Sequence, residues 1–90
     1  MDYTKKINEL LIEEFGLNDG MRMAGTVLPN ILSDFRKTKI LKTLPGLNVS
    51  EEYRFDDRKG SIFLTGYRDS KNIPHITEIK INERSVKGDF

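Results

Sequence analysis

Hydrophobic residues in the first part of the chain recur with the spacing of amphipathic helices. From Tyr3 to Phe15 they stand at positions i, i+4, i+7, i+8 and i+12, the stripe of a helix that buries one face. Gly16 follows, and glycine is favoured just beyond a helix C-terminus. The pattern predicts a first helix over residues 3–15.

A second stripe with helical spacing covers residues 24–35, but Pro29 lies within it. A proline inside a helix lacks the N–H donor, and its ring clashes with the carbonyl four residues earlier. Two arrangements fit the pattern. One helix can run over about residues 20–37 and bend, or a separate helix can begin at Thr26, so that the proline falls in its first turn. We expect the bent helix.

The hydrophobic period changes from helical to alternating at Gly46. Before it, residues 38–44 are out of phase with the second stripe and predict a short third helix or an irregular extension, ended by Leu44-Pro45-Gly46. Beyond it, alternating hydrophobic and polar residues predict half-buried strands. The predicted strands cover residues 47–55, 61–68 and 75–82, with connections at 56–60 and 69–74. The charged tail over residues 83–90 is expected to be frayed.

Short connections between these strands favour antiparallel neighbours. The predicted fold is α+β: one domain, residues 1–90, with two or three N-terminal helices (about 3–44) packed on a C-terminal three-stranded antiparallel meander (about 47–82). If the second stripe splits, the order becomes that of a winged helix, with the 56–60 loop as the wing tip. The residues expected to be buried are Leu10, Leu11, Phe15, Leu28, Ile31, Leu32, Phe35, Phe63, Ile79 and Ile81.

Candidate catalytic and cofactor-binding residues are sparse. The chain has no cysteine and one histidine, which excludes disulfides, cysteine nucleophiles and a zinc site of the usual ligands within one chain. His75 is predicted to be a partly exposed strand residue rather than a general base. Gly20 and Gly25 have the spacing of a phosphate-binding loop, but Thr26 stands where that motif requires lysine. We therefore expect a protein that is not an enzyme and has no cofactor or metal.

Charge is balanced overall and uneven along the chain. The 15 basic and 14 acidic residues give a net charge of +1, which argues against a bulk polyanion binder. Residues 1–20 carry two basic and five acidic groups, whereas residues 21–48 carry five basic and one acidic group. The basic groups predict a ridge at the end of the helical part, which the cations of the following hairpin extend. The candidate partner-binding residues are Arg36, Lys37, Lys39, Lys42, Arg54, Arg58 and Lys59, and the alternative is an acidic first-helix face of Glu9, Glu13 and Glu14.

These features predict a small non-enzymatic regulator that binds a protein partner through its charged faces, such as an inhibitor, an adaptor or an immunity-type protein. The alternative is a nucleic-acid-binding domain of winged-helix-like order that uses the basic ridge and the hairpin. No purely apolar run exceeds three residues, so we expect no membrane association and a cytoplasmic location. Abundant Ile, Asn and Lys are associated with low-GC bacterial or phage proteins. The oligomeric state is left open.

Overall fold

Helix α1 (Tyr3–Phe15) forms over the predicted residues in the computed structural model, which describes residues 3–55 and 60–90. Gly16 follows it with a φ of 90°, and its N–H donates to the carbonyl of Ile12 at 2.8 Å. This left-handed residue stops the helix and turns the chain directly into the next one. The buried residues of α1 are Ile7, Leu10 and Leu11.

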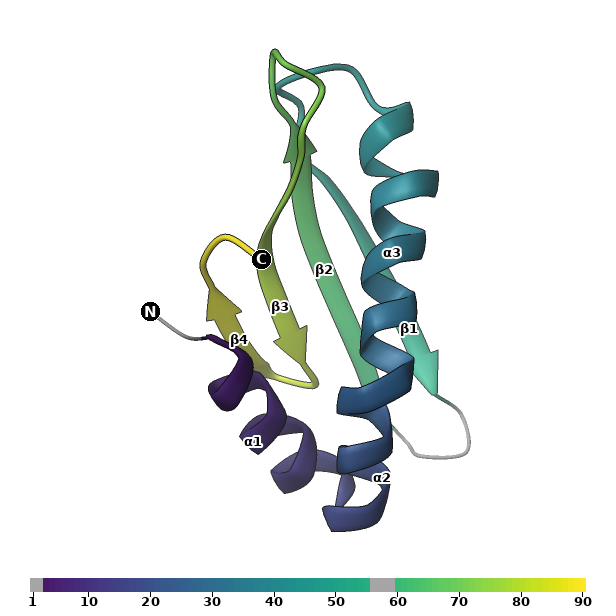
Figure 1. Ribbon diagram of the computed structural model, residues 1–90, viewed down its shortest axis with the longest axis vertical. Helices are drawn as coiled ribbons and strands as arrows, with labels where there is room; N and C mark the ends of the chain where they lie inside the picture. The colour runs from purple at the N-terminus through teal and green to yellow at the C-terminus, as the bar shows by residue number, and fades with distance from the viewer. Residues whose placement is uncertain (1–2, 56–59) are drawn as a thin grey trace.

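The second helix is continuous, as the bent-helix prediction expected, and the two-helix alternative is wrong. It consists of α2 (Leu17–Arg22), a π-helical turn η1 (Met23–Val27) and α3 (Leu28–Thr38), and the junction residues keep right-handed helical backbone angles. Figure 1 shows α2 running into α3 without a break. The π turn comes just before Pro29, and its wider backbone accommodates a residue that cannot donate to the carbonyl four positions back.

After α3 the chain makes one 3₁₀ turn, η2 (Ile40–Lys42), which is the short extension expected over residues 38–44. The winged-helix order is therefore not present, because the second stripe forms one continuous helix and does not split into two. In the part of the chain that the structure describes, no helix is both long and apolar enough to cross a bilayer.

The sheet has four antiparallel strands, and the prediction of three was wrong. In the order β1-β2-β3-β4 they are β1 (Val49–Phe55), β2 (Gly60–Arg68), β3 (Pro74–Ile81) and β4 (Arg84–Lys87). The first three strands lie within two residues of their predicted limits. The fourth occupies the tail that the sequence predicted to be frayed.

The tail is ordered because Asn82 reverses the chain. Its φ of 53° lies in the left-handed region that asparagine tolerates, so a two-residue turn brings β4 back along β3. Beyond β4, the N–H of Gly88 donates to the carbonyl of Thr77 at 3.1 Å, which continues the pairing. The hydrophobic side chain of β4, Val86, is 3% exposed and belongs to the core.

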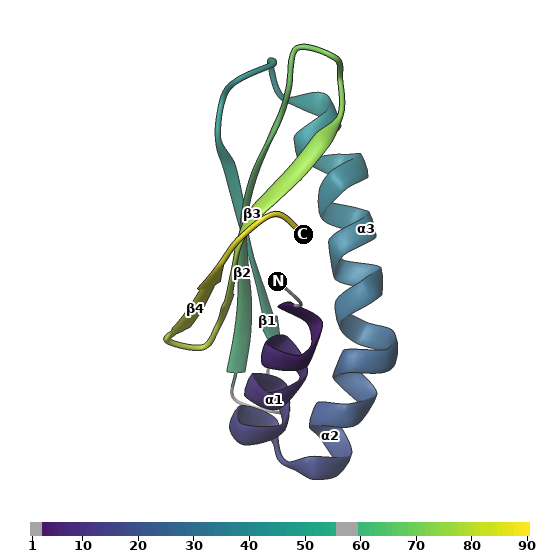
Figure 2. The same cartoon turned by 60° about the vertical axis from the view of Figure 1, so that its left-hand side comes forward.

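All helices lie on one face of the sheet, and the opposite face is bare (Figure 2). Of the residues expected to be buried, Phe15 and Leu32 are only partly buried at the margin of the core. Phe63 was wrongly predicted: Ile62 and Leu64 face the helices and are fully buried, so the residue between them points to the bare face. The other buried hydrophobic residues that the prediction omitted are Ile7, Met23, Ile40, Ile76 and Val86.

Gly66 allows η2 to approach the sheet closely. It lies at a bulge between β2 and β3. A Cβ at this position would lie 2.4 Å from the carbonyl oxygen of His75 and 2.7 Å from Cδ1 of Ile40. Only glycine fits there, and its absent side chain lets Ile40 anchor the end of the helical layer on the strands.

Candidate functional site

Two loops lie side by side at one end of the molecule, uppermost in Figures 1 and 2: residues 43–48 between η2 and β1, and residues 69–73 between β2 and β3. The first loop contains a tight turn. Pro45 suits the second position of a type II turn, and Gly46 supplies the positive φ, 82°, that the third position requires. The N–H of Leu47 donates to the carbonyl of Leu44 at 3.3 Å.

The second loop is organised by the carboxylate of Asp69. Its Oδ1 accepts hydrogen bonds from the backbone N–H groups of Lys71, at 2.8 Å, and Ile73, at 3.0 Å. The backbone N–H of Asp69 also donates to the carbonyl of Ile73 at 3.0 Å. Asn72 takes the left-handed conformation, with a φ of 65°. These contacts hold the loop from within.

Arg68 joins the two loops. Its Nη2 donates to the carbonyl of Thr43 at 2.7 Å, and its Nη1 donates to Oδ1 of Asn72 at 3.3 Å. The carbonyl of Arg68 accepts the N–H of Gly46 at 2.8 Å. A guanidinium can bridge both loops because its donors form a planar fork. The two loops therefore form one ordered surface.

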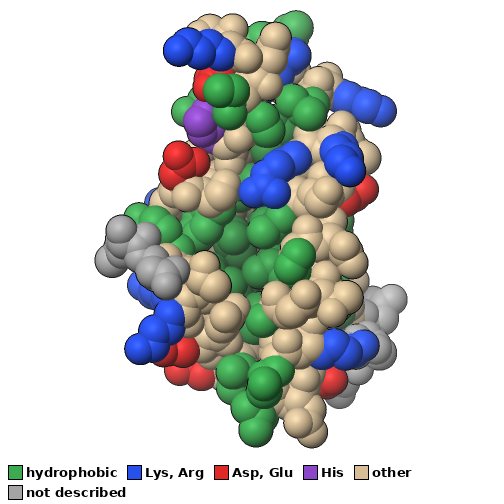
Figure 3. Space-filling model, viewed as in Figure 1, with side chains coloured by type: hydrophobic (Ala, Val, Ile, Leu, Met, Phe, Trp, Pro, Cys, Tyr) green, Lys and Arg blue, Asp and Glu red, His purple; other side chains and the backbone are tan. Residues whose placement is uncertain are grey.

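This surface presents large hydrophobic side chains to solvent. Leu44 is 69% exposed, and Leu41, Leu47 and Ile73 at the same end are each at least 40% exposed. Hydrophobic and basic side chains lie close together at this end in Figure 3. Grouped exposure of this kind marks interaction sites. We call this surface the tip, and it comprises Leu41, Leu44, Leu47 and Ile73 with Lys42 and Lys71.

The tip carries positive charge. Lys42 and Lys71 are exposed and have no ion-pair partner among the described residues. Asp69 is the one acidic residue in the segments 41–48 and 69–73. Its carboxylate is hydrogen-bonded to the backbone of its own loop and to His75, and it forms no ion pair with either lysine.

Lys39, a residue of the predicted basic ridge, forms an ion pair that joins the end of α3 to β1. Its Nζ lies 3.1 Å from the carboxylate of Glu51, and nearby the hydroxyl of Tyr53 donates to Oδ2 of Asp34 at 2.9 Å. Burial and the bond to Asp34 raise the pKa of Tyr53 above its usual value, so this phenol stays protonated. Lys37 remains exposed on α3.

Two other cations predicted for the ridge, Arg36 and Arg54, do not join it. Arg36 is partly buried and donates from Nη2 to the carbonyl of Phe90 at 3.3 Å. Arg54 points to the bare face of the sheet, where its Nε lies 2.5 Å from Oε1 of Glu52. Alternation along β1 places Arg54 on the side away from α3, so Arg54 does not extend the ridge. Arg58 and Lys59 lie outside the described residues.

The alternative acidic face is largely used by the fold. Glu13 and Glu14 both contact Nη1 of Arg84, the second at 3.7 Å. Oε1 of Glu14 also accepts from Nδ2 of Asn82 at 2.7 Å. Glu9 alone of the three is exposed without a described partner. These contacts hold α1 against the β3–β4 hairpin and reduce the charge available to a partner.

His75 lies behind the tip loop. Its Nε2 is 2.8 Å from Oδ2 of Asp69, its Nδ1 is 3.4 Å from Oδ1 of Asp89, and its ring stacks on Tyr67 with a centroid separation of 5.0 Å. The hydrogen bond to Asp69 raises the pKa of His75, and the same bond lowers the pKa of the Asp69 carboxyl. His75 is a partly exposed strand residue, as predicted, and it positions the residue that organises the loop.

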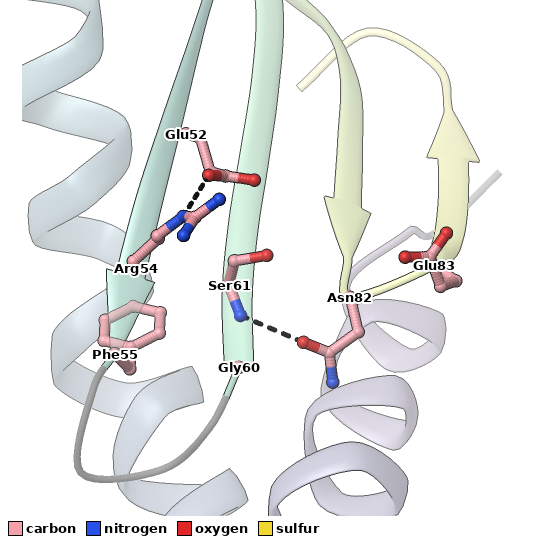
Figure 4. A pocket seen from close by; sticks show the side chains of 7 residues that line it. All are labelled: Glu52, Arg54, Phe55, Gly60, Ser61, Asn82 and Glu83. Carbon is pink, nitrogen blue, oxygen red and sulfur yellow. Dashed lines mark hydrogen bonds and ion pairs between the residues drawn. The ribbon is translucent and has the colours of Figure 1, made fainter.

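A hollow of about 540 Å³ lies at the end of the molecule opposite the tip (Figure 4). Several of its polar groups are paired with each other: Arg54 with Glu52, and Oδ1 of Asn82 with the N–H of Ser61 at 2.9 Å. Among the described residues, no three acidic or histidine side chains gather as a metal site. The hollow is lined by Glu52, Arg54, Phe55, Gly60, Ser61, Asn82 and Glu83.

Comparisons of the chain with protein-family models, with curated proteins and with solved structures found no match. The functional assignment therefore rests on the site itself.

Sequence reasoning identified one residue of the tip, Lys42, and missed the others. Leu41 and Leu44 are out of phase with the preceding helical stripe, which was a sign that no helix face would bury them. Nothing in the local pattern around Ile73 or Lys71 marks them, because they join the tip only through the pairing of β2 with β3.

Proposed function

We propose that the protein is a small non-enzymatic regulator that binds an acidic protein through the tip, in the manner of an inhibitor or adaptor. One observation carries the proposal: exposed hydrophobic side chains from two loops, including Leu44, Leu47 and Ile73, gather beside the unpaired Lys42 and Lys71.

The apolar side chains of the tip supply the binding energy. Removing a leucine side chain from water is worth about 1.5–3 kcal/mol at full burial. Leu44 and Leu47 are more than half exposed in the free protein, so most of this gain remains for a complex. A partner must therefore offer an apolar cleft.

The lysines of the tip specify the charge of that partner. Lys42 and Lys71 flank the hydrophobic side chains, so a cleft rimmed by Asp and Glu carboxylates is complementary. Complementary charge of this kind accelerates association and excludes partners of like charge.

The hydrogen bonds within the tip reduce the entropic cost of binding. Arg68 and Asp69 already hold both loops in place, so fewer backbone torsions need to be ordered in a complex. A preorganised surface is typical of a dedicated recognition site.

A capture experiment with matched variants tests this proposal. The variant Leu44→Asp/Leu47→Asp changes the tip, and Leu17→Asp/Met21→Asp makes the same chemical change at other exposed hydrophobic positions. Each protein is incubated with nuclease-treated lysate of the source cells, and captured proteins are identified by mass spectrometry. We expect an acidic protein that wild type and the Leu17/Met21 variant capture and that the tip variant does not.

The identified partner is then purified and titrated with the same three proteins. Loss of affinity of about tenfold or more in the tip variant alone supports the proposal. Equal affinity of all three proteins contradicts it. If wild type captures material from untreated lysate but none from nuclease-treated lysate, the nucleic-acid alternative replaces the protein partner.

A further inference from the structure

The two edge strands of the sheet, β1 and β4, differ in how well they are protected from pairing with another chain. An edge strand exposes a row of N–H and C=O groups, and proteins protect such edges with short strands, charged side chains or a covering helix. β4 has four residues, of which three are exposed, and its Arg84 contacts Glu13 and Glu14 of α1. The β4 edge is therefore protected.

β1 is longer, and its outer edge is open among the described residues. It has seven residues without proline or glycine, and it pairs with β2 in one unbroken register. No other described strand pairs with it, and the helices lie on one face of the sheet (Figures 1 and 2). The hydrophobic residues of β1, Val49, Tyr53 and Phe55, are only partly buried, whereas the core residues of β2 and β3 are at most 1% exposed. A further strand can therefore add to this edge.

The hydrogen bonds of β2 show which groups of β1 point outward. The carbonyl of Ser61 accepts the N–H of Asn82 at 2.9 Å, and the N–H of Ser61 donates to Oδ1 of the same residue, so both groups point toward β3. Because this direction alternates along an antiparallel strand, the next residue, Ile62, points toward its β1 partner Tyr53. The two neighbours of Tyr53 then direct their N–H and C=O groups away from β2; they are Glu52 and Arg54.

The side chains of Glu52 and Arg54 carry opposite charges and lie together on the bare face of the sheet. Nε of Arg54 is 2.5 Å from Oε1 of Glu52, and the two side chains are 77% and 42% exposed, respectively (Figure 4). If two β1 strands pair antiparallel about Tyr53, Glu52 of each copy faces Arg54 of the other. Facing opposite charges stabilise a sheet, whereas like charges destabilise it. Pairing about Glu52 would set two glutamates opposite each other, so charge favours Tyr53 as the centre.

We infer that the protein forms a symmetric dimer in which the β1 strands of two copies pair antiparallel about Tyr53 and join the two sheets. A twofold axis applies the same contact twice, so one strand supplies both halves of the interface. The two Tyr53 side chains face each other at the axis, and facing aromatic side chains add to the stability of a sheet. Because β1 runs away from the tip (Figure 1), the two tips lie at opposite ends of the dimer and stay free.

Sedimentation of the full-length protein from about 10 μM to 1 mM tests the dimer. We expect the mass of wild type to rise from that of one chain toward that of two. Glu52→Arg and Arg54→Glu each set like charges opposite each other and should weaken the dimer about tenfold or more. The double variant Glu52→Arg/Arg54→Glu restores opposite charges and should dimerise as wild type does. The control Lys80→Glu reverses a charge on the bare face of the central strand β3 and leaves the dimer unchanged.

A mixture of the two single variants separates a charge contact from a folding defect. Opposite charges face each other again only in the mixed dimer, so we expect the mixture to dimerise at concentrations at which neither variant does so alone. A wild type that stays monomeric overturns the inference. Single variants that dimerise like wild type, or a double variant that is no better than the single ones, also overturn it.

Amide hydrogen exchange tests the backbone pairing directly. The N–H of Tyr53 points toward β2 and should exchange slowly at every protein concentration. The N–H groups of Glu52 and Arg54 point outward, so their exchange should slow only as the dimer forms. If the protein dimerises while the exchange of these two amides stays unchanged, another surface joins the copies and the inference is wrong.

Discussion

Exposed hydrophobic side chains occur at both ends of the molecule, but the charges beside them differ. Near the α1–α2 turn, Leu17 is 62% and Met21 59% exposed. There Arg22 pairs with Asp19 at 3.7 Å, so the local charges compensate each other. At the tip, similar exposure is accompanied by lysines that have no acidic partner among the described residues.

The comparison shows that exposure alone does not define an interface. Single exposed leucines are normal in soluble proteins. At the α1–α2 turn the exposed side chains follow from the chain reversal at Gly16. After the reversal, little of the protein covers the short helix α2. At the tip, two loops far apart in sequence are tied together by Arg68, and their hydrophobic side chains form one surface. The two ends therefore differ in two ways. At the tip the lysines have no acidic partner among the described residues, and hydrogen bonds hold its two loops together.

The largest predicted effect separates the core from the tip. Phe35 is fully buried, and Phe35→Ala should reduce the free energy of unfolding by about 3–5 kcal/mol. Leu44→Ala removes a side chain that packs little and should change it by about 0.5 kcal/mol or less. Chemical denaturation of both variants measures the difference. A loss above about 1 kcal/mol in Leu44→Ala would show that the tip is part of the core.

The next effect concerns the order of the tip. Arg68→Met removes the hydrogen bonds to Thr43 and Asn72 and should cost about 1.5–3 kcal/mol of stability, while also weakening partner binding. Arg22→Met, near the α1–α2 turn, breaks only an exposed pair and should cost less than about 1 kcal/mol. Denaturation and partner titration of both variants test this. Equal losses of stability in the two variants would show that the tip is no more ordered by its hydrogen bonds than the α1–α2 turn.

A smaller effect is expected from charge reversal at the tip. Lys42→Glu/Lys71→Glu should slow association with the acidic partner about tenfold and reduce its salt dependence. Stability should change by about 0.5 kcal/mol or less per site. The control Lys5→Glu/Lys6→Glu reverses two exposed lysines of α1. Stopped-flow measurements at several salt concentrations compare the association rates of the two double variants. Identical rates for both variants would exclude electrostatic steering by the tip.

The smallest effect is a pH dependence behind the tip. The pKa of His75 is raised in the folded protein, so its contribution to stability is fully present below its unfolded pKa, about 6.5. The contribution is lost as pH rises through the folded pKa, which lies above that value. The denaturation midpoint should therefore fall as pH rises above about 6.5 in wild type, and it should fall less in His75→Gln. The same slope in both proteins would contradict the pairing with Asp69.

His75→Gln also tests whether the imidazole is needed for function. We predict that the variant keeps its partner affinity, because glutamine can still donate a hydrogen bond to Asp69. Loss of activity in a folded variant would point to a chemical role for the imidazole.

The elements that depend on local pattern were predictable. The stripe from Tyr3 to Phe15 gives α1 at the predicted limits, and Leu44-Pro45-Gly46 ends the helical part where turn chemistry requires it. The alternating segments become β1, β2 and β3. Each of these features depends on backbone preferences and side-chain periodicity within a few residues, which the sequence displays directly.

The predictions failed where the answer lies in distant residues. Both faces of β2 carry hydrophobic residues, and only the position of the helices decides that Ile62 is buried and Phe63 is not. The tail folds as β4 because Arg84 contacts Glu13, which lies 71 residues away, and because Val86 fills the core. No local sequence pattern predicts these contacts.

The sequence by itself determined an α+β domain, the places of α1 and of the first three strands, and a balance of charge in which one segment is basic. Only the tertiary structure decided which cations stay unpaired. It joins Thr43 to Arg68 across 25 residues, and it brings the loop that carries Ile73 beside the loop that carries Leu44. The physical reason is that pairing and burial depend on distances between segments, and those distances exist only after the helices have covered one face of the sheet.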